Sequence, residues 1–270
     1  MEIFDTSRVD LVVLSHPDGD HIGGLGRVVR QLDVETLALH RPALHGGSNL
    51  RASGAVEDLV RVAQQHGVRQ VLEPFAGVHA FDGAIMVASP SESAYERLIR
   101  GQVDRERQGA RRSTRGLTTS RFAQRVVARV LPYLPREVPF DDAGGDSPRN
   151  NSSTVLDLRI GDERTLFTAD AGVPALTYAA DFLDWARRAD VPIRNFQVPH
   201  HGSRHNLSSM VLDRLLGAPK DDRVGWAFIS ISAEAAEDPR YPSPRVTNAC
   251  LRRGYPAVIN SWTQLTVAEP

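Results

Sequence analysis

The chain has 270 residues, of which 41% are hydrophobic and 24% charged, and its formal net charge is −1. No apolar run approaches the roughly 20 residues of a membrane span. The start, "MEIFDTSRVD", lacks the basic region of a secretion signal. Cys250 is the single cysteine, which excludes an internal disulfide framework. We therefore expect a soluble, cytoplasmic protein with no membrane association.

The first third of the chain predicts strands alternating with helices. Residues 9–15 form an apolar run that is typical of a strand buried on both faces. A helix is expected over 55–67, where Val56, Leu59 and Val60 share one face. The other elements expected here are a short helix over 27–32 and strands over 36–42, 69–74 and 83–90.

Residues 92–149 interrupt this pattern with two expected helices, 95–108 and 118–134, between loop-like flanks. We interpret them as an insertion in a single domain over residues 1–270, because strand patterns resume directly afterwards. A β-hairpin turning at Gly161–Asp162 comes first. The elements expected after it are helices over 174–190, 207–217 and 243–254, and strands over 194–203, 225–232, 256–260 and 263–269. The mixture predicts a layered α/β fold.

The predicted insertion is rich in arginine. Eleven arginines lie between Arg97 and Arg136 inclusive, against Asp104 and Glu106. Such a segment can neutralise phosphates. An arginine-rich segment is more often a solvated surface insertion. The sequence leaves open whether this segment binds phosphates or is such an insertion.

The stretch "SHPDGDHIGG" after the first apolar run contains four side chains that can bind a metal, His16, Asp18, Asp20 and His21. Imidazole and carboxylate together suit zinc, manganese or iron. On an extended loop His16 and Asp18 would point the same way. Asp20 and His21 would point apart and could serve a second ion or the chemistry. A lone histidine or aspartate is usually structural, but four in six residues predict a metal site.

Two later strands also end in such residues. Asp170 follows "LFTA", and His200, His201 and His205 follow "NFQVP". Taken alone, Asp170 would more often be a turn or cap residue, and the histidine pair could be a polar loop. Strand ends can converge at one edge of a sheet, where loops carry binding residues on a rigid scaffold. The sequence therefore predicts that these residues share a site with the first cluster.

The motifs "SHPDGDHIGG", "NNSSTVLDL", "LFTADA" and "VPHHGS", in this order, resemble those of metallo-β-lactamase-fold hydrolases. They most resemble the branch of the β-lactamase-like domain of ComEC-type competence proteins and its stand-alone relatives. The resemblance implies an αββα sandwich, with Zn²⁺ or Mn²⁺ bound as one or two ions at one edge. The metal ligands that it implies are His16, Asp18, Asp20, His21, Asp170 and His200.

The resemblance also implies further roles. Asp18 takes the place of a more common histidine, and His201 could contribute to the site or donate to a substrate oxygen. Asn151, Ser152 and Ser153 match a stretch close to the site, for which we expect no direct role.

Two departures from the family pattern stand out. Only eight residues precede the first strand, so we expect the first sheet to be incomplete or the start to be truncated. Tyr241 stands where relatives often have a histidine, which puts the second metal position in doubt. Its hydroxyl can still donate to a phosphate or an oxyanion. No further early histidine matches, and the candidates left by elimination are His40, His45 and His79.

These observations favour a metal-dependent hydrolase, most specifically a phosphodiesterase or nuclease that acts through metal-activated water. In that hypothesis Asp20 orients or deprotonates the water, and His201 or Tyr241 stabilises negative charge. The Arg97–Arg136 region would bind nucleic acid. Two alternatives stay open. One is a hydrolase of a small ester, lactone or thioester, and the other is a degenerate, non-catalytic binding or regulatory module. The sequence does not define the oligomeric state.

Overall fold

The computed structural model describes residues 6–112, 137, 140, 147–231, 241–261 and 264–267. The chain divides into two compact units. Of the described residues, unit 1 comprises 6–75 and 91–112, and unit 2 comprises 76–90 and all those from 137 onwards. Each unit has its own sheet, and each is described by itself.

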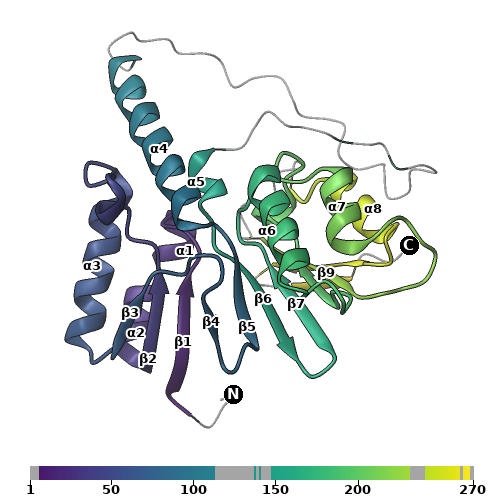
Figure 1. Cartoon of the computed structure of the whole chain (residues 1–270), viewed down its shortest axis with the longest axis horizontal. Coiled ribbons are helices and arrows are strands. Elements are labelled where there is room, and N and C mark those ends of the chain that lie inside the picture. The colour runs from purple at the N-terminus through teal and green to yellow at the C-terminus, as the bar shows by residue number, and fades with distance from the viewer. Residues whose placement is uncertain are drawn as a thin grey trace. The chain divides into compact units, whose positions relative to one another are not determined.

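Unit 1 contains a three-stranded parallel sheet in the order β1-β2-β3 (Figure 1). Its strands are β1 (Arg8–Leu14), β2 (Asp33–Leu39) and β3 (Gln70–Leu72). Its helices are α1 (Gly19–Ile22), α2 (Leu25–Gln31), α3 (Arg51–Gln65) and α4 (Glu92–Arg112), together with the 3₁₀ turn η1 (Pro42–His45). Parallel strands require a crossover between them, and α2 and α3 supply these crossovers.

The core of unit 1 forms between its sheet and the helices α2 and α3. Val56, Leu59, Val60 and Ala63 recur along one face of α3 and are buried. They join Leu37 and its neighbours on the strands in one hydrophobic cluster. The apolar periodicity that predicts this helix therefore also selects the face that packs on the sheet.

Unit 2 contains an eight-stranded mixed sheet in the order β11-β10-β9-β8-β7-β6-β5-β4. Its strands are β4 (His79–Ala80), β5 (Ile85–Ser89), β6 (Val155–Ile160), β7 (Glu163–Phe167), β8 (Asn195–Gln197), β9 (Trp226–Ile231), β10 (Ala257–Ser261) and β11 (Gln264–Val267). Its helices are α5 (Pro148–Asn151), α6 (Val173–Trp185), α7 (Ser209–Leu216) and α8 (Pro244–Leu251), together with the 3₁₀ turn η2 (His200–Gly202). Strands β7 to β10 are parallel to one another.

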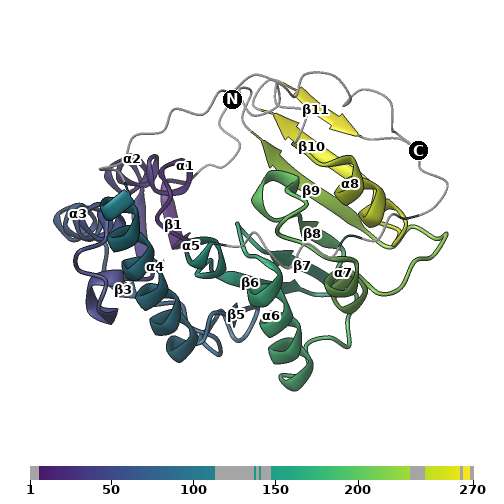
Figure 2. The same cartoon turned by 90° about the horizontal axis from the view of Figure 1, so that it is seen from above.

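Helices α6, α7 and α8 lie along one side of this sheet (Figure 2). Strand β9 shows why the two faces differ, since Ala227 and Ile229 are buried in the core while Phe228 and Ser230 alternate with them and are exposed. Side chains alternate across a strand, so one set packs on the helices and the other faces away from them.

The mixed α/β class with two sheets agrees with the prediction. The hairpin also forms as predicted, with Ile160 paired to Glu163 across its turn. Five of the described elements were not predicted, namely the two-residue strand β4, the one-turn helices α1 and α5, and the 3₁₀ turns η1 and η2. The turn η2 falls in the predicted strand 194–203, of which only Asn195–Gln197 forms β8. The predicted helix 118–134 lies outside the described residues, and the single domain over 1–270 stays a prediction. None of the described helices is both long and apolar enough to cross a bilayer.

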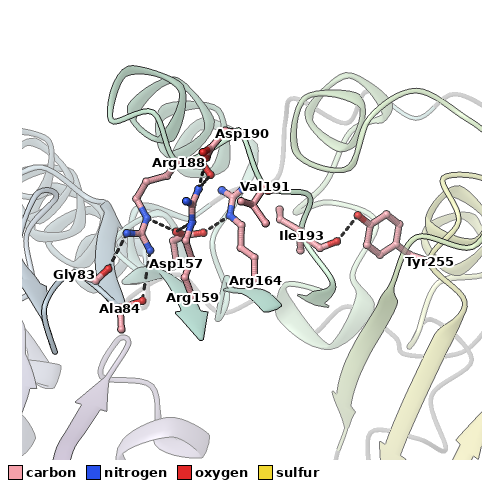
Figure 3. A network of polar contacts seen from close by, with 10 residues as sticks. All are labelled: Gly83, Ala84, Asp157, Arg159, Arg164, Arg188, Asp190, Val191, Ile193 and Tyr255. Atoms are coloured by element: carbon pink, nitrogen blue, oxygen red, sulfur yellow. Dashed lines mark hydrogen bonds and ion pairs between the residues drawn. The ribbon is translucent and has the colours of Figure 1, made fainter. Parts of the chain in front are cut away.

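A buried carboxylate organises one end of unit 2. Asp157 of β6 is fully buried and accepts from Arg164 Nε and Arg188 Nε, each at 2.5 Å (Figure 3). Arg159 Nε lies 3.8 Å from the same carboxylate. A charge this deeply buried is tolerated only when it is paired and hydrogen-bonded, and three arginines meet that condition here.

The same guanidinium groups also bind backbone carbonyls. Arg188 donates to the oxygens of Gly83 and Ala84 before β5, and Arg164 donates to the oxygen of Val191 before β8 (Figure 3). Arg159 donates to the carbonyl of Arg188. One carboxylate therefore links β5, β6, β7 and the segment that joins α6 to β8.

We expect Asp157→Asn to destabilise the protein by about 3–5 kcal/mol, because it leaves buried arginines without their counter-charge. Urea unfolding followed by circular dichroism measures the change. Asp190→Asn is the matched control, since Asp190 is an exposed carboxylate paired with Arg159 at 2.7 Å, and it should change the midpoint little. Equal midpoints for the two variants would contradict this role of Asp157.

Candidate metal centre

In unit 1, the loop after β1 places two imidazole rings around one hydroxyl. Ser15 Oγ lies 3.2 Å from His16 Nδ1 and 3.3 Å from His21 Nδ1. A hydroxyl oxygen has two lone pairs, so Ser15 can accept from the Nδ1–H of both rings, and this arrangement leaves the lone pairs of both Nε2 atoms for an ion. The ring centroids are 4.2 Å apart. Both Nδ1 atoms are thus engaged with Ser15.

Each Nε2 atom lies beside a carboxylate. His16 Nε2 is 3.6 Å from Asp18 Oδ2, and His21 Nε2 is 3.6 Å from Asp20 Oδ2. These spacings exceed a hydrogen bond but suit two ligands of one ion, since each ligand atom lies about 2 Å from the metal. The His16 side chain is fully buried, whereas that of Asp20 is 57% exposed. The donor set therefore fits a divalent ion, with Asp20 open to solvent.

The backbone of this loop differs from the expected extended conformation. Residues Gly19–Ile22 form the single helical turn α1, which Asp18 precedes as its N-cap residue. A Cβ at Gly23 would lie 2.6 Å from the Gly19 carbonyl oxygen, so the close of this turn requires glycine. The turn brings His21 back towards Ser15, and an extended chain would not do so.

In unit 2, Asp170 and His200 occupy equivalent places after neighbouring strands. Strands β7 and β8 are parallel and pair Thr165 with Asn195, an offset of 30 residues that also relates Asp170 to His200. His200 Nε2 lies 3.7 Å from Asp170 Oδ2. The predicted convergence of these two strand ends is therefore present within unit 2.

The orientation of His200 is set by Asn206. The Asn206 amide nitrogen donates to the Asp170 carbonyl oxygen at 2.9 Å, which leaves the Asn206 oxygen to face His200 Nδ1, also at 2.9 Å. A protonated Nδ1 donates to this oxygen and leaves the Nε2 lone pair facing Asp170, whereas the Asn150 amide nitrogen, 3.1 Å from the same Nδ1, donates only to an unprotonated Nδ1. A histidine ligand held through its other nitrogen in this way is common at metal sites.

His201 is fixed by its backbone and by one hydrogen bond. Its φ of +56° is left-handed, and Nδ1 lies 2.6 Å from the Ser230 carbonyl oxygen, so Nδ1 carries the proton. Gly202 follows with φ of +82°, and a Cβ there would meet Pro242 at 2.6 Å. The glycine thus lets the histidine turn pack against the segment that carries Tyr241, whose ring centroid is 6.3 Å from that of His200.

The sequence pattern missed three polar residues that hold these side chains, Ser15, Asn150 and Asn206. Asn150 Nδ2 lies 3.1 Å from His200 Nδ1. The neighbouring Asn151 instead accepts from the Ala175 backbone at the start of α6. Ser152 and Ser153 are buried beside them. The sequence offered a signal for Ser15, which begins the stretch "SHPDGDHIGG", and for Asn150, which begins the motif "NNSSTVLDL", but none for Asn206.

A groove of about 510 Å³ lies on the sheet face of unit 2 that points away from α6–α8. Its lining side chains carry no charge, and they are Thr165, Phe167, Asn195, Gln197, Phe228, Ile229, Ser230, Val258 and Asn260. Ser230 connects the groove to His201 through the hydrogen bond described above. The groove can therefore accommodate an uncharged or partly apolar group next to a histidine.

The two sheets and mixed α/β order are consistent with the metallo-beta-lactamase fold. A family model described as the metallo-beta-lactamase superfamily matches residues 4–111. This range includes the 15–24 loop and ends before Asp170 and His200. No curated protein matches the chain. Residues 4–111 are thus similar to the metallo-beta-lactamase superfamily, and the His and Asp groups described above could bind a divalent metal.

We expect Ser15→Ala to weaken Zn²⁺ binding by about 10- to 100-fold, because both rings lose the hydroxyl that orients them. Competition with a chromophoric chelator measures the affinity. Ser48→Ala, at an exposed serine of the same unit, is the matched control and should bind as the unaltered chain does. Equal affinities for the two variants would exclude this role of Ser15.

Proposed function

We propose that the chain is a metal-dependent hydrolase and, more specifically, a phosphodiesterase or nuclease. The observation that carries the proposal is the Ser15 hydroxyl between His16 and His21, within the stretch that the superfamily model matches. We propose as metal ligands the residues named from the sequence, His16, Asp18, Asp20, His21, Asp170 and His200. A bound Zn²⁺ or Mn²⁺ supplies Lewis acidity that lowers the pKa of water towards neutrality.

In this proposal three side chains act on the water and the substrate. Asp20 is the most exposed of the loop carboxylates, and it orients the attacking water or takes its proton. His201 has its proton on Nδ1 and turns Nε2 to the substrate, where in its protonated form it stabilises negative charge. The Tyr241 hydroxyl donates to a phosphate oxygen.

Exposed arginines on α4 support the choice of a phosphodiester. Arg97, Arg100, Arg105 and Arg107 are all exposed on this helix. They begin the Arg97–Arg136 region, most of which lies outside the described residues. Such groups bind backbone phosphates without reading the sequence of a nucleic acid. We therefore propose single-stranded or duplex nucleic acid as the substrate class.

The full chain, loaded with Mn²⁺ or Zn²⁺, should cleave bis(p-nitrophenyl) phosphate and fluorescent oligonucleotides. Asp20→Asn should lower kcat by about 10²- to 10⁴-fold, the usual range for loss of a proton-transfer group. Asp162→Asn, at the exposed hairpin turn, is the control and should keep its activity. Absence of metal-dependent cleavage of every phosphodiester tested would contradict the proposal.

The uncharged groove of unit 2 favours a second candidate, a hydrolase of a small ester, lactone or thioester. Phe167 and Phe228 offer apolar surface there, and no charged side chain lines it. Under this alternative, p-nitrophenyl acetate turnover should be insensitive to salt and to replacement of the four α4 arginines by glutamine. Phosphodiester cleavage that weakens steeply with salt favours the first proposal. Less than one metal ion per chain after purification without chelator would favour the non-catalytic alternative.

A further inference from the structure

We propose that unit 1 holds a second divalent metal site, formed by His45 at the end of η1 and by Glu92 and Glu96 at the start of α4. One ligand atom from each of these three residues lies within 4.8 Å of the other two. Glu92 and Glu96 are four residues apart on one helix, so their side chains share a face. The site shares no residue with the 15–24 loop.

Glu73 prepares His45 for this role. His45 Nε2 lies 3.1 Å and 3.2 Å from the two Glu73 carboxylate oxygens. An ionised carboxylate only accepts, so the proton stays on Nε2 and the lone pair of the neutral ring lies on Nδ1. The arrangement of carboxylate, histidine and metal is a recurring means of orienting a histidine ligand. It leaves Nδ1 as the atom that faces α4.

The distance from Nδ1 to α4 matches a shared ion better than direct pairing. His45 Nδ1 lies 3.8 Å from Glu96 Oε1, beyond a hydrogen bond. Two ligand atoms that are each about 2 Å from one ion lie between about 3 and 4 Å apart. The observed separation falls in this range. Glu96 is 43% exposed, so its carboxylate can adjust around an ion.

Charge also favours a cation at this position. Three carboxylates, Glu73, Glu92 and Glu96, lie around His45, and the side chains of His45 and Glu73 are only 8% and 18% exposed. The buried His40 ring stacks on Tyr95 nearby. One proton on His45 would balance one of the three negative charges. A divalent ion bound by His45, Glu92 and Glu96 balances the two carboxylates of α4 and leaves Glu73 paired with the ring N–H.

Tyr95 provides a second observation at the same place. It lies between Glu92 and Glu96 in α4, its ring meets that of His45 edge-on at 5.2 Å, and it is 1% exposed. Its hydroxyl makes no hydrogen bond to any residue within the part of the chain that the structure describes. A buried hydroxyl in that state is a place to look for a water or an ion. Phe75 lies beside Tyr95 and also meets His45 edge-on, at 5.5 Å, so the two rings form an apolar wall next to His45.

The donor set points to Zn²⁺ among the divalent ions. One imidazole and two carboxylates give the mixed nitrogen and oxygen ligands that zinc accepts, with a fourth position left for water. Mn²⁺ is the harder alternative that carboxylates also bind. An ion here would join the η1 turn to α4, the helix that carries the exposed arginines.

The test counts zinc bound by the full chain after chelation, reloading and desalting. We expect Glu92→Gln/Glu96→Gln to bind one zinc ion fewer per chain than the unaltered protein, by mass spectrometry of the metal content. Asp104→Asn, which removes an exposed acidic group from the same helix, is the matched control and should bind the full number. Zinc should also raise the Tm of the unaltered protein more than that of the double variant.

Both altered glutamates lie towards solvent, so the double variant should fold, and circular dichroism verifies this. Equal zinc counts for the double variant and Asp104→Asn would overturn the second site. His45→Gln should reproduce the loss of one ion, and an unchanged count in a folded His45→Gln would also overturn it. The zinc count does not depend on activity, so the second site can be confirmed even if the proposed function is wrong. Likewise, the proposed function can be confirmed even if the second site is absent.

Discussion

A buried carboxylate is tolerated only where cations and donors surround it, and Asp157 meets this condition with three arginines. The remaining donors of those arginines bind carbonyls before β5, before β8 and after α6. The register of four strands in unit 2 is thereby tied to one buried charge. Apolar packing alone is less directional, because it constrains area and volume more than it constrains atomic positions.

The positions of Asp170 and His200 depend on the strands that the arginine pairs of Asp157 connect. Arg164 lies near the beginning of β7, and Asp170 follows the end of the same strand. The parallel pairing of β7 with β8 then puts His200 at the equivalent place one strand away. The ion pairs of Asp157 therefore lie near the beginning of β7. The loops after β7 and β8 carry the candidate ligands, and in these loops Asn206 orients His200 and the Ser230 carbonyl orients His201. A rigid sheet with polar loops at one edge suits a binding site.

In unit 1, too, apolar side chains position the strands and helices, and polar side chains orient the candidate ligands. Buried aliphatic side chains fix β1 and α3, and the polar residues lie where those elements end. Ser15 orients two histidines after β1, and Glu73 orients His45 after η1. Glu73 leaves the lone pair of the neutral His45 ring on Nδ1, and Ser15 positions the Nδ1 atoms of His16 and His21. Such assignments depend on side chains within hydrogen-bond reach, which for His45 and Glu73 are 28 residues apart in sequence.

The sequence by itself indicated the longer strands and helices among the described residues and the residues of ligand type, because hydrophobic period and local turn chemistry act over short segments. It also indicated that Asp170 and His200 follow strand ends. Only the tertiary structure decided that Asn206 turns His200, that α1 folds His21 back to Ser15, and that His45 meets α4. These contacts join segments through register and packing, and a linear pattern does not encode which distant polar groups come within 3 to 4 Å.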